Sequence, residues 1–471
     1  MIRMQVDGVE HAEFVRSGGP PCHRSQAPDR AAHRSAVMEQ FVISDSGQRA
    51  EAALREERRV AVTDADIIIV GAGAAGLSLA YRLTSPPARL GETSTIRGGR
   101  PAPRVLLIDA PPGPLRPPER TWCFWERGQG DFDDVVVRSW ERLSVRGPDG
   151  REWEDRPHPW RYKMIRSRGF EEFVDLRLAG SSLVERLTAT VDRVADQPDG
   201  AQVMATTPDG EQVLLHARWV YDSRPQRELP PGRTTMLQHF RGWFVRTAAP
   251  LAGATAPFAQ DTACLMDFRT PQPAHGLSFG YLLPLGPDRA LVEYTEFSAA
   301  PLSRASYDAA LEHYTTQILG LGPFEVWDTE QGVIPMTDAR FPRQTGPHTF
   351  RIGTSGGATR PATGYTFASV QRQSLAIASA YRRGAPPAPP RAHSRRSLAL
   401  DAVMLRALDS GRVTGAEFFT RLFEQVPMER MLRFLDGRTS VREDLTIGFA
   451  TPVLPMLRTV AEMPFLRRGA P

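Results

Sequence analysis

The stretch "DADIIIVGAGAAGLSLAYRL", residues 64–83, decides the fold of the first part of this chain. Its run of β-branched residues at 67–70 passes directly into glycines and then into helix formers, which predicts strand, tight turn and helix. Gly71, Gly73 and Gly76 have the spacing G-x-G-x-x-G. The first glycine permits the turn, the second lets backbone approach a pyrophosphate, and the third lets helix and strand pack closely. The stretch therefore predicts a dinucleotide-binding fold.

A second buried strand is expected at "RVLLID", residues 104–109, and it ends at Asp109. An acid in this place is expected to accept hydrogen bonds from a ribose hydroxyl. Its separation from the glycines exceeds the usual figure of about 20 residues. The Pro/Gly-rich stretch at 84–103, interpreted as a surface loop, accounts for the excess. The alternative is a glycine turn and an exposed strand-end Asp without a ligand.

A late element favours FAD over NAD as the dinucleotide. The stretch "RIGTSGGATRPATGYTFASV", residues 351–370, places glycines and a proline before a predicted helix. FAD is longer than NAD, and a late loop and helix N-terminus typically close over its flavin end. The alternative is a helix start that is rich in glycine for turn reasons alone. The cofactor-binding residues expected in this element are Gly356, Gly357, Pro361, Thr363 and Gly364.

Composition bounds the classes of protein to which the chain can belong. Its 471 residues suit a two-domain protein, and 41% hydrophobic residues allow a sizeable core. The formal net charge is +4, with Arg far more frequent than Lys. A GC-rich genome explains that bias, and a weak attraction to anionic lipid is the alternative. No basic run with interleaved aromatics is present, so we expect no nucleic-acid partner.

Cysteine usage and hydropathy bear on the cellular compartment. Cys22, Cys123 and Cys264 are widely separated and form no CxxC pair, which argues against a zinc site or disulfide framework and fits a reducing cytoplasm. The longest apolar stretch, residues 67–80, falls short of the roughly 20 residues that a membrane-spanning helix needs. No signal peptide is visible. We therefore expect a cytoplasmic protein that at most lies on a membrane surface, with no metal site.

The predicted organisation is an α/β protein in four parts. Residues 1–60 are expected to be a disordered extension, since they are polar and lack periodicity. Residues 61–140 and 335–385 are expected to form a discontinuous, Rossmann-like FAD-binding domain. Residues 141–334 read as a mostly β substrate domain, with short alternating runs separated by turns. Residues 386–471 are expected to be helical, and a membrane-facing surface and packing on the body of the protein are the alternatives for them.

The segment "LVEYTEFS", residues 291–298, contains the acidic residues of most interest. Alternate residues of a strand share a face, so Glu293 and Glu296 are expected to point in opposite directions. Glu293 shares its face with Leu291, Thr295 and Phe297, an apolar setting in which a carboxyl pKa can rise. We expect Glu293 to be a catalytic acid or cation stabiliser, the alternative being a salt bridge at a strand edge. Glu296 is expected to face solvent.

Seven motifs are more specific than the glycine fingerprint, which many flavoproteins share. They are "RTWCFWE" at 120–126, "LMDFR" at 265–269, "LVEYT" at 291–295, "GVIPM" at 332–336, "GGATRPATGYTFA" at 356–368, "FFTRLF" at 418–423 and "LRFLDG" at 432–437. Together with the fingerprint they span roughly residues 64–446 and resemble the lycopene cyclases of the bacterial and plant flavoprotein type.

The resemblance implies a fold similar to flavin hydroxylases and geranylgeranyl reductases. It implies closure of the linear ends of lycopene to give γ-carotene and β-carotene, with reduced FAD required, NADPH as the usual electron source, and a position on the membrane surface. Glu293 matches the first acid of the family motif F-L-E-E-T, the one associated with catalysis. Tyr294 stands at the second acidic position, so this chain lacks an adjacent second carboxylate there.

The remaining motif residues have expected roles and alternatives. Trp122, Phe124 and Trp125 are expected to line the polyene site, where aromatic faces stabilise a carbocation, with plain core packing as the alternative. An Asp267–Arg269 ion pair and a solvated or ion-paired Glu126 are also expected. The stretches at 418–423 and 455–468 are amphipathic, and they either pack on the body of the protein or face a membrane.

Two other function classes compete with a cyclase. One is a redox flavoenzyme, either an aromatic hydroxylase or a prenyl reductase. The other is a non-catalytic isoprenoid carrier on the same fold, which the intact glycine fingerprint disfavours.

Overall fold

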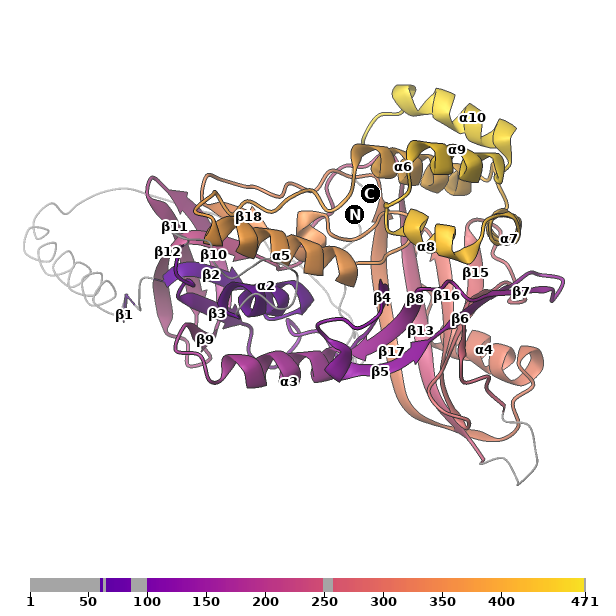
Figure 1. Cartoon of the computed structure of the whole chain (residues 1–471), viewed down its shortest axis with the longest axis horizontal. Coiled ribbons are helices and arrows are strands. Elements are labelled where there is room, and N and C mark those ends of the chain that lie inside the picture. The colour runs from indigo at the N-terminus through magenta and orange to yellow at the C-terminus, as the bar shows by residue number, and fades with distance from the viewer. Residues whose placement is uncertain (1–59, 62–64, 86–99, 249–256, 470–471) are drawn as a thin grey trace, which may run out of the picture.

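The computed structural model describes residues 60–61, 65–85, 100–248 and 257–469 (Figure 1). The predicted disordered extension at 1–60, apart from residue 60, lies outside the described residues. So does most of the predicted surface loop at 84–103.

The predicted strand, turn, helix and second strand are confirmed, and they lie in an eight-stranded sheet. Strands β12, β2, β3 and β9 run parallel side by side, and β10 and β11 extend the sheet antiparallel beyond β12, with which β1 and β18 also pair. The bounds are β1 Val60–Ala61, β2 Ala65–Val70, β3 Val105–Asp109, β9 Val184–Thr188, β10 Thr190–Gln197, β11 Gly200–Thr206, β12 Gln212–Asp222 and β18 Thr349–Arg351.

Strand β2 is buried on both faces, as its continuous run of β-branched residues requires. Ile67 and Ile69 pack against three helices, α2 (Ala74–Thr84), α3 (Ser167–Leu178) and α5 (Phe367–Arg382). Ile68 and Val70 point the other way into a cluster with apolar residues of β10, β11 and β12. Figure 1 shows the three helices beside this sheet. The glycine turn after β2 is thereby held on a rigid support.

A seven-stranded sheet forms the second layer, with strand order β17-β13-β16-β15-β14-β6-β7. Its central strands β13, β16 and β15 pair antiparallel with their neighbours. The bounds are β6 Arg142–Arg146, β7 Glu152–Asp155, β13 Thr235–Thr247, β14 Thr262–Asp267, β15 Leu277–Pro284, β16 Arg289–Ser298 and β17 Phe324–Thr337.

Both faces of the central strand β16 are covered. On one face Val292 and Tyr294 pack with Tyr307 and Leu311 of α4 (Arg304–His313), which a short π-helix at Tyr314–Ile318 continues. On the other face Leu291 belongs to a large core shared with the C-terminal helices and a small three-stranded sheet. That sheet has the order β4-β8-β5, with β4 at Thr121–Arg127, β5 at Val136–Trp140 and β8 at Trp160–Arg166.

The C-terminal part is helical, as predicted, and its helices gather at one end of the long sheet (Figure 1). They are α6 Arg395–Asp409, α7 Gly415–Gln425, α8 Met428–Leu435, α9 Val441–Phe449 and α10 Val453–Glu462. Apolar residues of α6, α7 and α8 enter the core that Leu291 shares, whereas α10 packs mainly on α6. The C-terminal helices therefore cover the face of β16 to which Glu293 belongs.

The sheet topology differs from the predicted division of the chain at residues 184–222. Residues 184–222, assigned from the sequence to the mostly β segment at 141–334, form β9 to β12 of the first sheet. Short alternating strands carry no signal of which sheet they join, because pairing partners are set by long-range register. The segment at 235–337 does build the second sheet, with α4 inserted between β16 and β17.

Candidate active site

The glycine fingerprint forms a narrow backbone cradle at the end of β2. Gly71 has φ +92°, a conformation that favours glycine, and its N–H donates to the carbonyl of Ile108 at 2.7 Å. Helix α2 begins at Ala74, with Gly73 as its N-cap. A Cβ at Gly76 would lie 1.8 Å from the Gly71 carbonyl oxygen, whereas a Cβ at Gly73 would meet no atom within 4 Å. The open space beside Gly73 fits the approach of a pyrophosphate to the helix N-terminus.

Asp109 closes this cradle from the next strand. It is the last residue of β3, and its Oδ1 accepts a hydrogen bond from the Ala72 N–H at 3.2 Å. The guanidinium of Arg116 lies 3.7 Å from its other carboxylate oxygen. Asp109 is therefore held beside the fingerprint. This position fits the predicted hydrogen bond to a ribose hydroxyl.

The late glycine loop lies against the fingerprint helix. A Cβ at Gly353 would be 3.0 Å from the Cβ of Ala75, and Gln371 of α5 donates to the Ser78 hydroxyl at 2.7 Å. Gly356 leaves no room for a side chain, because a Cβ there would lie 2.3 Å from the Arg351 carbonyl oxygen. Two segments nearly 300 residues apart in sequence thus meet at one site.

Positive φ angles and unpartnered polar atoms mark the rest of this loop. Gly357 and Gly364 have φ +75° and +72°, and Pro361 between them is half-buried. The Thr363 hydroxyl and the side-chain oxygen of Gln238 are buried without a hydrogen-bond partner among the described residues. Buried polar atoms normally have partners, so these two fit a loop built to receive a polar ligand.

A buried ion pair fastens the late loop to the C-terminal helices. Arg360 is 2% exposed and its Nε lies 2.7 Å from Asp401 of α6. Burial raises the pKa of Asp401 to about 6, and the Arg360 charge opposes that rise. His393 meets the Ala358 carbonyl oxygen at 3.0 Å in the same region. The loop is held from the side opposite to α2.

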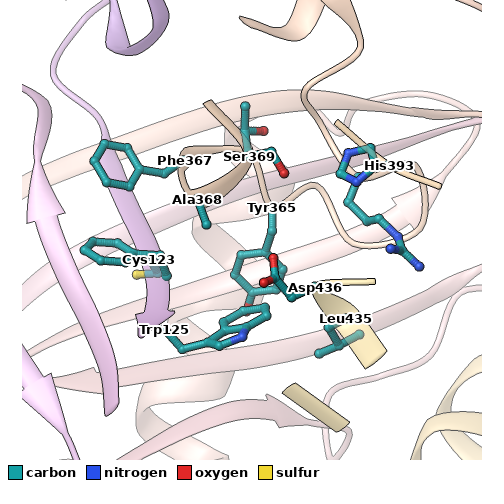
Figure 2. A pocket seen from close by; sticks show the side chains of 12 residues that line it. Cys123, Trp125, Tyr365, Phe367, Ala368, Ser369, His393, Leu435 and Asp436 are labelled. Atoms are coloured by element: carbon teal, nitrogen blue, oxygen red, sulfur yellow. The ribbon is translucent and has the colours of Figure 1, made fainter. Parts of the chain in front are cut away.

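The aromatic residues of β4 divide between two cores. Trp122 stacks on Phe367 of α5 with ring centroids 5.8 Å apart, and Phe124 lies 4.9 Å from the same ring. Trp125 points to the other side, where it meets Tyr365 edge-on at 4.7 Å. Figure 2 shows Trp125 beside Tyr365 in a pocket that also includes Cys123 and Phe367. Phe124 lines this pocket as well, whereas Trp122 does not.

A group of three phenols, the buried Tyr162 and the half-buried Tyr281 and Tyr365, extends from this pocket to β16. The Tyr162 hydroxyl lies 2.7 Å from that of Tyr281 and 2.9 Å from that of Tyr365. Burial raises the pKa of all three phenols, so they stay neutral. Tyr281 is the direct cross-strand neighbour of Glu293. The sequence analysis missed this group, because its members come from β8, β15 and the late loop.

Glu293 lies on the face of the long sheet that looks toward these aromatic rings. It is 8% exposed, and its Oε1 accepts one hydrogen bond, from the Thr295 hydroxyl at 2.6 Å. Burial is the main cause that raises its pKa to about 8, and the nearby carboxylate of Glu330 adds to the rise. A carboxylic acid that keeps its proton at neutral pH can serve as a proton donor.

Glu296 does point away from Glu293, but the expectation that it faces solvent is wrong. It is 7% exposed and accepts a hydrogen bond from the Tyr294 hydroxyl at 3.3 Å. Its Oε1 lies 4.0 Å from His239, whose pKa burial lowers to about 4. Helix α4 covers this second face of the sheet. Strand alternation predicts which way a side chain points, but it does not predict whether a helix buries that face.

Two smaller expectations are confirmed. Asp267 and Arg269 form a two-pronged ion pair, with contacts of 2.9 and 2.5 Å. Glu126 pairs with the buried Lys163 at 2.9 Å. Among the residues that the structure describes, no group of His, Cys, Asp and Glu could hold a metal ion.

This combination of a glycine cradle, a late closing loop and a long sheet under helices is the fold of FAD-dependent flavoproteins. The structure is similar to that of a geranylgeranyl bacteriochlorophyll reductase-like protein from Thermoplasma acidophilum, with TM-score 0.52, 12% identity, and 86% of this chain and 99% of that chain covered. It is equally similar to a flavoprotein/dehydrogenase from Cytophaga hutchinsonii, with TM-score 0.52, 10% identity, and coverage of 85% and 100%.

Within that class, the chain belongs to the lycopene cyclase protein family, whose model matches residues 66–461. It is also similar to a lycopene beta-cyclase of Paracoccus sp. (strain N81106 / MBIC 01143), with 26% identity over 435 residues, covering 86% of this chain and 99% of the relative. The resemblance and the flavoprotein fold inferred from the sequence are thus confirmed. None of the described helices is both long and apolar enough to cross a membrane.

Proposed function

We propose that this protein is an FAD-dependent lycopene β-cyclase that closes the linear ends of lycopene into β-ionone rings, by way of γ-carotene to β-carotene. The observation that carries the proposal is the buried Glu293 carboxyl, whose pKa is raised to about 8 and which lies opposite Tyr281 and near Tyr365 in a chain of this family. The proposed reaction is an isomerisation, so the product has the mass of the substrate.

The proposed chemistry begins with proton transfer from Glu293 to a terminal alkene carbon of the substrate. The tertiary cation that forms is attacked by the neighbouring double bond, the ring closes, and a ring proton passes back to the Glu293 carboxylate, which restores the acid. Cation formation needs a water-free site with aromatic faces. The rings of Trp125, Tyr162 and Tyr365 pack against one another on the side of the long sheet that carries Glu293, and we propose that they face the substrate.

The cofactor proposal rests on the fit between FAD and the two glycine segments. Gly71, Gly73 and Gly76 would hold the pyrophosphate with the N-terminus of α2, and Asp109 would hold a ribose hydroxyl. The late-loop residues already named would hold the flavin end. When bound in its reduced form, FAD would supply negative charge to a site in which positive charge develops, and NAD(P)H is the proposed electron source.

The decisive experiment is to express the chain in cells that accumulate lycopene and to measure the pigment spectrum and mass. A shift from red to orange-yellow at unchanged mass supports the proposal. A gain of two hydrogens per double bond would instead indicate a prenyl reductase. NAD(P)H oxidation with oxygen uptake and no pigment change would indicate a hydroxylase. Either of these two results, obtained with folded and FAD-loaded protein, contradicts the cyclase proposal.

We expect the cyclisation rate to fall at alkaline pH. The first step needs protonated Glu293, whose pKa is raised to about 8, so the active form predominates at neutral pH and is lost as pH rises through that value. Above it, the rate under saturating substrate is expected to fall about tenfold per pH unit, as for any reaction that needs one protonated group. Rates measured in detergent or lipid between pH 6 and 10 test this; a flat profile contradicts it.

The proposed substrate dissolves in membranes, and α9 and α10 offer a surface that suits one. Their outer faces expose large apolar side chains at helical spacing. These residues are Val441, Leu445, Phe449, Leu454, Leu457 and Val460, and Phe465 follows at 84% exposure. Arg442 and Arg458 are exposed on the same helices. Apolar side chains flanked by positive charge match an anionic lipid surface, which we propose as the partner of α9 and α10.

We expect the double variant Phe449→Asp/Leu454→Asp to bind lipid at least tenfold more weakly than the unchanged protein. The two side chains are each 70% exposed, so the change should leave folding intact while it places charge where apolar contact is needed. Flotation with vesicles of phosphatidylcholine and phosphatidylglycerol measures the binding. Leu176→Asp, at an isolated position of α3 that is 78% exposed, is the matched control. Equal flotation of the double variant would contradict the proposal, and light scattering would show whether the face instead joins two copies.

A further inference from the structure

A second carboxyl stands in the same transverse row of the long sheet as Glu293. Gly242 of β13 pairs with Glu293 of β16 on one side and with Glu330 of β17 on the other. Residues directly opposite one another in neighbouring strands present their side chains on the same face. Both carboxyls therefore emerge on the face toward Trp125 and the three phenols, with a glycine between them.

The glycine lets the two acidic side chains lean into the same space. A Cβ at Gly242 would lie 3.3 Å from Cγ of Glu330 and 3.6 Å from Cβ of Glu293. It would also lie 2.8 Å from Cδ1 of Leu291, so a larger residue would have to displace that side chain. Glu330 is 8% exposed, as buried as Glu293. Two carboxyls in one dry space cannot both ionise easily, so one of them holds a proton.

The hydrogen bonds show which of the two carries the charge. Glu330 accepts two hydrogen bonds from Thr121, at 3.1 Å from its N–H and 2.7 Å from its hydroxyl, and the cation of Arg166 further favours its ionised form. Within the part of the chain that the structure describes, Glu293 accepts a single hydrogen bond, from Thr295. Burial raises the pKa of both acids. Glu330 ionises first, because it accepts more hydrogen bonds and lies near the Arg166 cation.

Among the described residues, the neutral thiol and phenols beside the pair keep their protons at neutral pH. The Cys123 thiol feels both carboxylates, and burial raises its pKa to about 12. The phenols of Tyr281 and Tyr365 stay neutral because burial raises their pKa values. The charged groups that act on Glu330 are Arg120, Arg166 and Asp328.

We propose that Glu330 is a positioning residue whose fixed negative charge, acting across Gly242, keeps the proton on Glu293. The inference rests on the proposed function, since it assigns the device that holds the acid ready for proton transfer. It also gives Thr121 a role: the first residue of β4 stabilises the anion and ties the strand that carries Trp125 to the long sheet. After the proton leaves Glu293, two negative charges remain beside the substrate cation.

The test is an infrared titration of the full-length, FAD-loaded protein without substrate. The C=O band of a protonated carboxyl that disappears in Glu293→Gln reports Glu293. In the unchanged protein this band should be lost as pH rises through about 8. In Glu330→Gln, which keeps an oxygen for the Thr121 hydrogen bonds, we expect the midpoint to fall by about one pH unit, because a like charge has been removed. The alkaline limb of any activity profile should move with it.

The matched control removes the same charge from the same strand at an exposed place. Glu325→Gln breaks a surface pair with Arg246 and should leave the midpoint unchanged. If Glu330→Gln does not fold, Glu330→Met replaces the buried charge with an apolar side chain of similar length. A midpoint in the folded Glu330 variant equal to that of the unchanged protein overturns the inference. The infrared band reports Glu293 whether or not the chain cyclises lycopene, so failure of the proposed function is seen separately.

Discussion

Glu293→Gln is expected to abolish cyclisation, with a loss of at least 1,000-fold in rate, while FAD binding stays intact. Glutamine has the same shape and still accepts from the Thr295 hydroxyl, but it cannot donate a proton to an alkene. General acid catalysis by a positioned group typically contributes about 100- to 10,000-fold, and the neighbouring carboxyl of Glu330 is proposed to hold the negative charge of the pair rather than its proton. Pigment extracted from lycopene-accumulating cells, with flavin content measured on the purified variant, tests the expectation.

Glu296→Gln is the matched control, since it makes the same change three residues away on the same strand. Glu296 lies under α4, on the face opposite to Glu293, and glutamine can still accept from the Tyr294 hydroxyl. We expect the Glu296 variant to retain cyclisation. If the Glu293→Gln protein is active, Glu293 is not the catalytic acid. The proposal that the chain is a cyclase would then still be tested by the pigment experiment.

Gly76→Ala is expected to yield protein without bound FAD and therefore without activity. The new Cβ would lie 1.8 Å from the Gly71 carbonyl oxygen, a clash with backbone that only a shift of α2 away from β2 can relieve. Such overpacking costs about 1–3 kcal/mol and opens the cradle that is to hold the pyrophosphate. Thermal unfolding and flavin absorbance of the purified protein measure both effects.

The same substitution at another helical glycine separates this clash from a general effect. Gly169 lies within α3, and a Cβ there would meet no atom within 4 Å, so Gly169→Ala should keep full FAD occupancy. Its stability should stay equal or rise, because alanine favours the helix. Normal flavin content in Gly76→Ala would contradict the proposed place of the cofactor.

Local patterns in the sequence predict the elements around the glycine cradle correctly. The β-branched run, the glycine spacing and the acid at a strand end are short-range features, and β2, α2 and β3 follow them. Strand alternation also gives the opposite directions of Glu293 and Glu296, as their bonds to Thr295 and Tyr294 confirm.

Features set by distant pairing could not be predicted in this way. The burial of Glu296 depends on α4, which follows the strand of Glu296. The position of Glu330 beside Glu293 depends on how β16 and β17 each pair with β13 at Gly242. Strand alternation in β4 separates Trp125 from Trp122, but which side holds the pocket is decided by strands and helices far along the chain. The sequence around Glu296 and Glu330 does not show which residues will contact their side chains.

The Arg360–Asp401 pair has a consequence for how the molecule comes apart. Removing either partner of a buried ion pair leaves an uncompensated charge, at a cost of about 3–5 kcal/mol. We therefore expect the late glycine loop and α6 to unfold together rather than separately. A chain cut before α6 would keep the late glycine loop but leave Arg360 without Asp401, so we expect such a truncated protein to hold flavin poorly although its glycine fingerprint is intact.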